Sequence, residues 1–306
     1  MSWSTLTPAS KARLLGLLLS CILVIASLGV LSVKGLNFGL DFTGGYITEI
    51  NTTSVTTITD LKAKLSSEVA SKLTITKAGE YHFVLREAPE ASKASTWQAE
   101  LNKQGVDYTV LSSSFLGSQV GDELFEQGCL ALFAALIAIM VYLAVRFEWR
   151  LAVGSVVALL HDLILVLGLF SLLGLEFNLT VLASLLAIIG YSLNDSIIVG
   201  DRVRELLRIQ PDNQRINTHV VINDAIGSTL TRTLITSGTT LATIACIWLL
   251  AGAALTGFAI ALFVGIVVGT FSSICIAATL PQLLGLSSDN YTQTLDDKTK
   301  AYMELP

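Results

Sequence analysis

The chain has 306 residues, of which 52% are hydrophobic and only 14% are charged, and its mean hydropathy is +0.67. Soluble domains carry roughly 25% charged residues, so this composition excludes an ordinary soluble protein and indicates an integral membrane protein. The formal net charge of -5 identifies no partner, because orientation in a membrane follows the Lys and Arg of short loops. The 4 cysteines fall inside or at the edges of apolar stretches, which predicts neither a disulfide framework nor a metal site.

Six apolar stretches are each long enough to cross a hydrocarbon core of roughly 30 Å. They lie near residues 14–33, 127–145, 151–173, 179–200, 233–253 and 257–280. Lys and Arg occur before the first stretch, after the second, after the fourth and after the sixth, whereas the loops 174–178 and 251–256 have none. Since positively charged short loops stay in the cytoplasm, both termini are predicted to be cytoplasmic. The first stretch is interpreted as an uncleaved anchor.

The segment between the first two stretches is predicted to be a folded domain outside the cytoplasm. Its pattern favours strands at 46–51, 72–76, 81–86 and 107–111 and helices at 58–70 and 93–104. The order β-α-β-β-α-β is the ferredoxin-like split pattern. The expected fold is therefore an α-helical integral membrane protein with six transmembrane helices and a small α+β ferredoxin-like periplasmic domain.

The expected parts are residues 1–33, the cytoplasmic N-terminus and first transmembrane helix, then 34–126, the periplasmic domain, 127–285, the five remaining helices, and 286–306, a cytoplasmic tail. Within the sixth helix, small residues recur at intervals of four, at Ala261, Gly265, Gly269 and Ser273. Such a ridge lets helix backbones approach closely. We expect it to pack against a neighbouring span.

The fourth span carries a charged residue away from its ends. Asp195 follows Asn194 and lies about six residues, or about 9 Å of helix, inside the boundary marked by Asp201. An ionised Asp near a span's centre costs about 2.5 to 3.5 kcal/mol on insertion scales, so such residues usually face the bundle interior and have partners. We therefore expect a partner for Asp195.

The fifth span offers that partner. Polar side chains recur on one helical face; they are Ser228, Arg232, Thr236, Thr239 or Thr240, and Thr243. This polar stripe is predicted to pack against the fourth span and to pair Arg232 with Asp195. A carboxylate inside a bundle that exchanges between a cation and water can act as a proton or cation relay, for which Asp195, Arg232 and Asn194 are the candidates. A buried Asp–Arg pair can instead serve only to fix helix register.

Two further polar groups lie near the middle of the third span. His161 and Asp162 come about eleven residues after Arg150. Together with Thr236 and Thr240 of the fifth span, they are candidates for a second part of the relay or for simple helix packing. A third conspicuous stretch, GLNFGLDFTGG at residues 35–45, follows the first span; its Gly39, Asp41, Gly44 and Gly45 define a predicted periplasmic-exit motif or a flexible exit loop.

These strings together resemble the SecD/SecF family of bacterial accessory translocase proteins, a branch of the resistance-nodulation-division (RND) superfamily, and within it the SecF branch. The similarity rests on the exit motif, on RFEWR at 146–150, on HDLILVLG at 161–168, on the run from 171 to 205, and on TRTLITSGTT at 231–240. It covers nearly the whole chain. The matching Asp and Arg of the family are regarded as ion-path charges, which the resemblance carries over to Asp195 and Arg232.

The resemblance implies a non-enzymatic subunit of the bacterial cytoplasmic (inner) membrane. It implies assembly with SecD beside the SecYEG channel, with YajC and YidC as further candidate partners and a translocating unfolded polypeptide as substrate. The implied activity is to use the proton-motive force or a sodium gradient to promote export after SecA-driven translocation, with H+ or Na+ as the coupling ion and no cofactor or nucleic acid.

Two other functions are compatible with parts of the pattern. An intramembrane aspartyl protease would use Asp162 and Asp195 as a pair that shares a proton, but the sequence lacks the Gly-x-Gly-Asp context expected around such a residue. An RND-type small-molecule exporter would need a larger external domain than the roughly 70 residues that are predicted to fold here.

Overall fold

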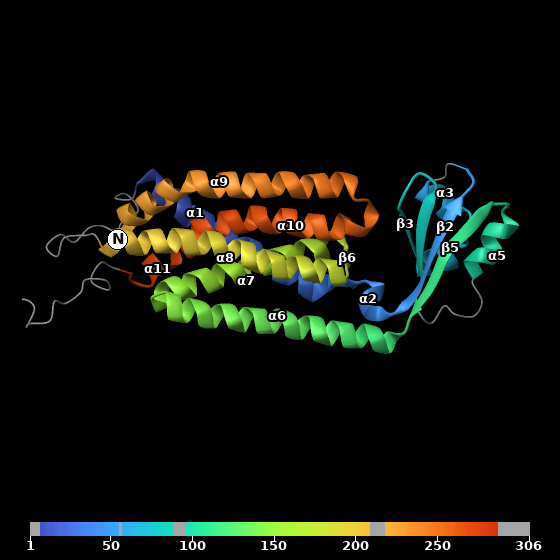
Figure 1. Ribbon diagram of the computed structural model, residues 1–306, viewed down its shortest axis with the longest axis horizontal. Coiled ribbons are helices and arrows are strands. Elements are labelled where there is room, and N and C mark those ends of the chain that lie inside the picture. The colour runs from blue at the N-terminus through green and yellow to red at the C-terminus, as the bar shows by residue number, and fades with distance from the viewer. Residues whose placement is uncertain (1–6, 55–56, 88–95, 209–217, 287–306) are drawn as a thin grey trace, which may run out of the picture.

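The computed structural model describes residues 7–54, 57–87, 96–208 and 218–286. A bundle of long helices occupies most of the molecule, and a small α+β domain lies at one end of it (Figure 1). Six helices in the described part of the chain are long and apolar enough to cross a membrane, which confirms the predicted number of spans. They are α1 (Pro8–Lys34), α6 (Ser118–Arg146), α7 (Trp149–Leu173), α8 (Leu179–Arg208), α9 (Thr218–Leu250) and α10 (Ala253–Ser272), the last extended by the π-helical turn η3 (Ser273–Ala277) and by α11 (Leu280–Leu283).

The bundle has three inner and three outer helices. In the most apolar part of α7, α8 and α10, 56%, 56% and 50% of the residues are buried, compared with 11%, 11% and 17% in α1, α6 and α9. The small-residue ridge explains how α10 reaches the centre, since a Cβ atom added at Gly265 would overlap the side chain of Ile188 in α8. The expected close packing of the ridge is therefore observed, and α8 is its neighbour.

The fifth span differs most from its predicted bounds. The apolar stretch suggested a start near residue 233, whereas α9 begins at Thr218. The turns of α9 before residue 233 are less apolar than the predicted span. They nevertheless pack against α8, where Val221, Ile222 and Ala225 belong to one buried cluster with Val203 and Leu207. Packing between two helices that continue beyond the apolar stretch therefore stabilises this extension.

The small domain contains one antiparallel sheet of four strands in the order β3-β4-β2-β5. The strands are β2 (Gly45–Thr52), β3 (Leu73–Lys77), β4 (His82–Glu87) and β5 (Tyr108–Leu116), and the helices are α3 (Ile58–Ala63), α4 (Ser67–Lys72) and α5 (Thr96–Lys103). The order of elements agrees with the predicted β-α-β-β-α-β pattern. Its core is a cluster of buried side chains that includes Trp97, Phe83 and Ile50.

Two predicted elements of this domain were wrong in detail. The helix expected at 58–70 is divided into α3 and α4, because the backbone N–H and hydroxyl of Ser66 both donate to the Glu100 carboxylate of α5, each at 2.7 Å. The strand expected to end at 111 continues to Leu116, since β5 pairs with β2 along its whole length. Residues 93–95 of the predicted second helix, and residues 287–306 of the predicted tail, lie outside the described residues.

Candidate functional site

Asp195 lies on the buried face of α8 and is fully inaccessible to solvent. Neither of its carboxyl oxygens has a hydrogen-bond partner among the described residues. The neighbouring Asn194 amide is the polar side chain that acts most strongly on this carboxyl, and Arg232 acts on it through its charge. A buried carboxyl group without a hydrogen bond is costly, so the Asp195 carboxyl lacks the stabilisation that buried carboxyl groups usually have.

The predicted direct pair between Asp195 and Arg232 is not formed. No ion pair joins them within 4.0 Å in the described part of the chain, and Arg232 is exposed on the outer side of α9. At the start of the stripe, the Ser228 hydroxyl accepts a hydrogen bond from Arg202 Nε of α8 at 3.1 Å, whereas the threonines bond within α9. Thr236, Thr240 and Thr243 each donate to a backbone carbonyl four residues earlier in α9.

A different face of α9 packs against the bundle. Thr233 and Ser237 are buried there, and Ser237 accepts a hydrogen bond from the Tyr191 hydroxyl at 3.4 Å and contacts the Thr270 hydroxyl at 2.8 Å. The helical period identified the polar stripe but could not show which way it faces, because α9 is polar on two adjacent sides. Ser237 is for this reason not among the predicted site residues.

His161 and Asp162 form the other polar group inside the bundle, and here the structure brings several predicted and unpredicted residues together. The Asp162 carboxylate accepts hydrogen bonds from the hydroxyls of Ser192 in α8 and Ser272 in α10, at 2.5 and 2.9 Å. Its other oxygen lies 2.9 Å from His161 Nδ1. Gly269 allows this approach, since its Cα carries no side chain beside Ser192 and Asp162. Asp162 thus links the three inner helices.

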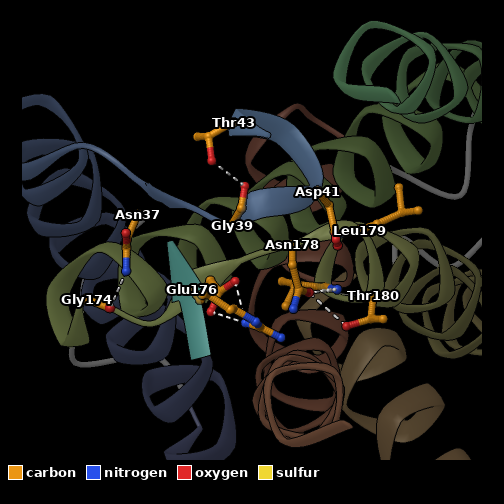
Figure 2. A network of polar contacts seen from close by, with 11 residues as sticks. Asn37, Gly39, Asp41, Thr43, Gly174, Glu176, Asn178, Leu179 and Thr180 are labelled. Carbon is orange, nitrogen blue, oxygen red and sulfur yellow. Dashed lines mark hydrogen bonds and ion pairs between the residues drawn. The ribbon is translucent and has the colours of Figure 1, made fainter. Parts of the chain in front are cut away.

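The exit motif is folded against the bundle rather than being a flexible loop (Figure 2). Strand β1 (Asn37–Phe38) pairs in parallel with β6 (Glu176–Phe177), and Gly39 N donates to Phe177 O at 2.8 Å. In the short helix α2 (Leu40–Thr43), Asp41 accepts a hydrogen bond from the backbone N–H of Leu179 at 3.0 Å. Asp41 therefore stabilises the N-terminus of α8, where a negative charge is favoured.

Glycine is required at each of the two consecutive positions 44 and 45 of the motif, for a different steric reason at each. At Gly44 the backbone φ is 70°, and a Cβ atom would lie 2.7 Å from the backbone nitrogen of Ser118. At Gly45 φ is 144°, and a Cβ atom would overlap the backbone of Glu87. Only glycine fits both the backbone conformation and the space.

One contact between the domain and the bundle was not predicted. Arg86 of β4 donates from Nη1 to both carboxylate oxygens of Glu176 at 2.7 and 2.6 Å, and each side chain is about one quarter exposed. A cavity of about 280 Å³ lies beside the pair and is lined by residues of the sheet, of the α7–α8 loop and of α10. Glu176 is the only charged residue in the loop 174–178. This isolated charge was the one feature of the sequence that could have indicated a contact here.

No three His, Cys, Asp or Glu side chains of the described ranges gather in a way that could hold a metal ion.

Comparison with known proteins identifies the family. Residues 96–286 match the model of the C-terminal region of the protein export membrane proteins SecD and SecF, and residues 29–53 match the SecD/SecF GG motif, which contains Gly44 and Gly45. The chain is 40% identical to the protein translocase subunit SecF of Desulfurispirillum indicum over 282 residues, 89% of this chain and 90% of that one. It is 38% identical to SecF of Escherichia coli O157:H7 over 293 residues, 92% of this chain and 89% of that one.

Two solved structures share the fold. The crystal structure of SecDF, a translocon-associated membrane protein from Thermus thermophilus, superimposes with a TM-score of 0.79 at 32% identity and is matched over 93% of this chain. A SecDF structure in a super-membrane-facing form gives 0.67 at 33% identity over 97% of this chain. In both cases the match spans 39% of the SecDF chain. By its sequence, its exit motif and its helical bundle, the chain belongs to the SecD/SecF family.

Proposed function

We propose that this chain is the SecF-type subunit of an accessory complex of the Sec protein translocation pathway, which uses an ion gradient to promote polypeptide export. The names of its relatives as protein translocase subunits support this role. The proposed coupling mechanism rests on one observation. The Asp195 carboxyl is fully buried and has no hydrogen-bond partner in the described part of the chain.

In the proposed mechanism, Asp195 binds and releases the coupling ion, H+ or Na+. Its neutral or ion-bound form is compatible with the buried site, whereas the free carboxylate attracts Arg232. Because α8 begins at the hydrogen bond between Asp41 and Leu179, a shift of α8 is transmitted to the exit motif and to the small domain. The domain would then hold or pull an emerging polypeptide.

The exposed polar stripe of α9 supports a partner within the membrane. Arg232 and Thr239 are exposed on an outer helix, and a charged side chain facing lipid is costly. We propose that a SecD subunit covers this stripe and supplies the region that the longer SecDF chains contain in addition. SecYEG and the translocating polypeptide are the further proposed partners, together with YajC and YidC.

The proposed orientation places the chain in the bacterial cytoplasmic membrane with both termini in the cytoplasm. The α+β domain is then periplasmic, and its strand order is that of a ferredoxin-like domain. A non-enzymatic role is supported by the different surroundings of the two intramembrane carboxyl groups. Asp162 is hydrogen-bonded to His161, Ser192 and Ser272, and no hydrogen bond joins it to Asp195 among the described residues, whereas the two carboxyl groups of a protease pair would share a proton.

The test is export of a pulse-labelled secreted protein in cells depleted of their own SecF, with SecD present. The native chain is expected to restore export, and Asp195→Asn, which cannot ionise, is expected to abolish the gradient-dependent part at equal abundance. Asp122→Asn is the matched control, because Asp122 is exposed in α6 and should keep full activity. Equal export by the native and Asp195→Asn proteins would refute the ion-binding role.

A further inference from the structure

Thr233 is a buried threonine of α9 whose hydroxyl makes no hydrogen bond. The residue is 2% exposed, and its Oγ1 has no partner among the described residues. Other threonines of the same helix donate to the carbonyl four residues earlier; they are Thr229, Thr236, Thr239, Thr240 and Thr243. Threonines in helices commonly make this bond, and buried polar atoms nearly always have a partner. The Thr233 hydroxyl is therefore free to serve an acceptor outside its own helix.

The packing of α9 on α8 places Thr233 at the level of Asp195. A hydrogen bond of 3.4 Å joins Tyr191 of α8 to Ser237 of α9. A second bond between the helices, at 3.1 Å, lies eleven residues later in α8 (191 to 202) and nine residues earlier in α9 (237 to 228), so the helices are antiparallel. Asp195 follows Tyr191 by one turn. Thr233 precedes Ser237 by one turn. Since residues four apart share a helix face, Asp195 and Thr233 lie in one layer of the α8–α9 interface.

Apolar clusters lie on both sides of this layer. Toward the outer end of α8, one cluster contains Ile188, Ile244 and Ile266. Toward the other end, a second cluster contains Val199 and Ala225. An ionised carboxyl group in apolar surroundings is stable only if hydrogen-bond donors compensate for the lost hydration. The donor to the carboxyl in this layer must therefore come from a side chain that reaches it.

The other polar side chains near this carboxyl are less well placed to donate from within the bundle. Asn194 and Arg232 act on it, but both are exposed. The hydroxyl of Ser196 is buried and without a partner. However, Ser196 is one turn after Ser192, which bonds to α7, so its hydroxyl lies on another side of α8. Thr233 is the buried donor on the side of α9.

We propose that Thr233 is a further residue of the ion site and that its hydroxyl donates a hydrogen bond to the Asp195 carboxylate when the coupling ion has left. This inference rests on the proposed function and deepens it. The two common rotamers of a helical threonine point the hydroxyl in different directions, so rotation about one bond makes or breaks the contact. A donor that acts on the ionised form favours release of a proton by about 10-fold or more.

The test measures protonation of Asp195 in the full chain, reconstituted in phosphatidylcholine membranes. Dicyclohexylcarbodiimide, an apolar reagent, modifies carboxyl groups in their protonated form, and mass spectrometry gives the rate of modification of Asp195 at each pH. Thr233→Val removes the hydroxyl at nearly constant volume. Asp195 should then stay reactive to a pH about one unit higher, which is a 10-fold change in proton affinity. Thr233→Ser keeps the hydroxyl and should give the native profile.

Two controls accompany the variants. Thr231→Val changes an exposed threonine of the same helix and should give the native profile. Modification of Asp162 in the same molecules should not change, because Ser192 and Ser272 still donate to it. The charged and titratable groups of the neighbouring helices stay the same in every variant; they are Arg232 of α9 and His161 and Asp162 of α7, and α10 has none. Thr233→Ala, which also lacks the hydroxyl, replaces Thr233→Val if that protein does not fold.

Two results would overturn the proposal. A native profile in Thr233→Val would show that the hydroxyl does not reach Asp195, and an equal shift in Thr233→Ser would show an effect of packing alone. The profile reads protonation and not export, so the two hypotheses fail separately. Loss of export in Asp195→Asn with no shift in Thr233→Val would refute only the role of Thr233. A shift in Thr233→Val with normal export by Asp195→Asn would keep the contact and refute the ion coupling.

Discussion

Asp41 and Leu179 are 138 residues apart, yet the carboxylate of the first accepts a hydrogen bond from the backbone N–H of the second at 3.0 Å. The end of the first span is thereby joined to the start of the fourth. The Asn178 side chain adds a second bond at this helix start by accepting from Val181 N at 3.1 Å. Two side chains from different parts of the chain therefore satisfy the first amides of α8.

The first prediction concerns this hydrogen bond. Asp41→Ala should destabilise the start of α8 by about 0.5 to 2 kcal/mol, the usual cost of losing an N-terminal capping side chain. Asp41→Asn should cost less, since it keeps an oxygen acceptor and loses only the charge at the helix N-terminus. Hydrogen exchange of the Leu179 and Val181 amides in the reconstituted protein measures the effect. Similar exchange in both variants and the native protein would contradict the assignment.

The second prediction concerns the Arg86–Glu176 ion pair. Either Arg86→Ala or Glu176→Ala should loosen the small domain from the bundle, and the effect of the pair should be no more than about 1 kcal/mol because both side chains are partly exposed and screened by salt. Spin labels in β4 and α8 should show a broader distance distribution in each variant. The double exchange Arg86→Glu with Glu176→Arg should narrow the distance distribution again. If it does not, the pair has no direct electrostatic role in holding the domain.

The third prediction concerns pH. Hydrogen bonds from the backbone N–H and the hydroxyl of Ser66 lower the pKa of Glu100 below its usual value. A carboxyl whose pKa is lower in the folded state stabilises the fold above its unfolded pKa of about 4.3, and this contribution is lost as the pH falls through the folded value. The junction of α3 and α4 should therefore become less protected from exchange in acid.

Glu100→Gln separates this effect from general acid destabilisation. The variant should be less protected than the native protein at neutral pH, and its protection near Ser66 should change less between pH 7 and pH 3, as measured by hydrogen exchange corrected for the intrinsic rate. If the native protein and the variant lost protection in parallel, the Ser66–Glu100 contact would not be the origin of the pH dependence.

The fourth prediction concerns the small-residue ridge. Gly265→Val should destabilise the bundle by about 1 to 3 kcal/mol, since the added side chain would be forced against Ile188. Gly238→Ala is the control, because a Cβ atom at Gly238 would have no atom within 4 Å and alanine favours the helix. Thermal unfolding of the purified proteins compares the two. Equal melting temperatures for both variants and the native chain would contradict the packing.

The elements that could be predicted from the sequence are those set by local pattern. The six spans, the order of strands and helices in the small domain, and the polar character of α9 all follow from periodicity. Periodicity does not show which side of a helix faces the bundle. Arg232 and Ser237 lie on different faces of α9, and the packing of α8 and α10 decides that the face with Ser237 is the buried one. The same holds for Asp162, whose partners Ser192 and Ser272 are far away in the sequence.

The chain enters and leaves the small domain at the same corner. Gly45, the first residue of β2, is paired with Leu116, the last residue of β5, and the two connections run side by side from the bundle to the sheet (Figure 1). We therefore expect the domain to rotate about the Gly45–Leu116 pair, and the Arg86–Glu176 ion pair is a contact between domain and bundle that such a rotation would have to break.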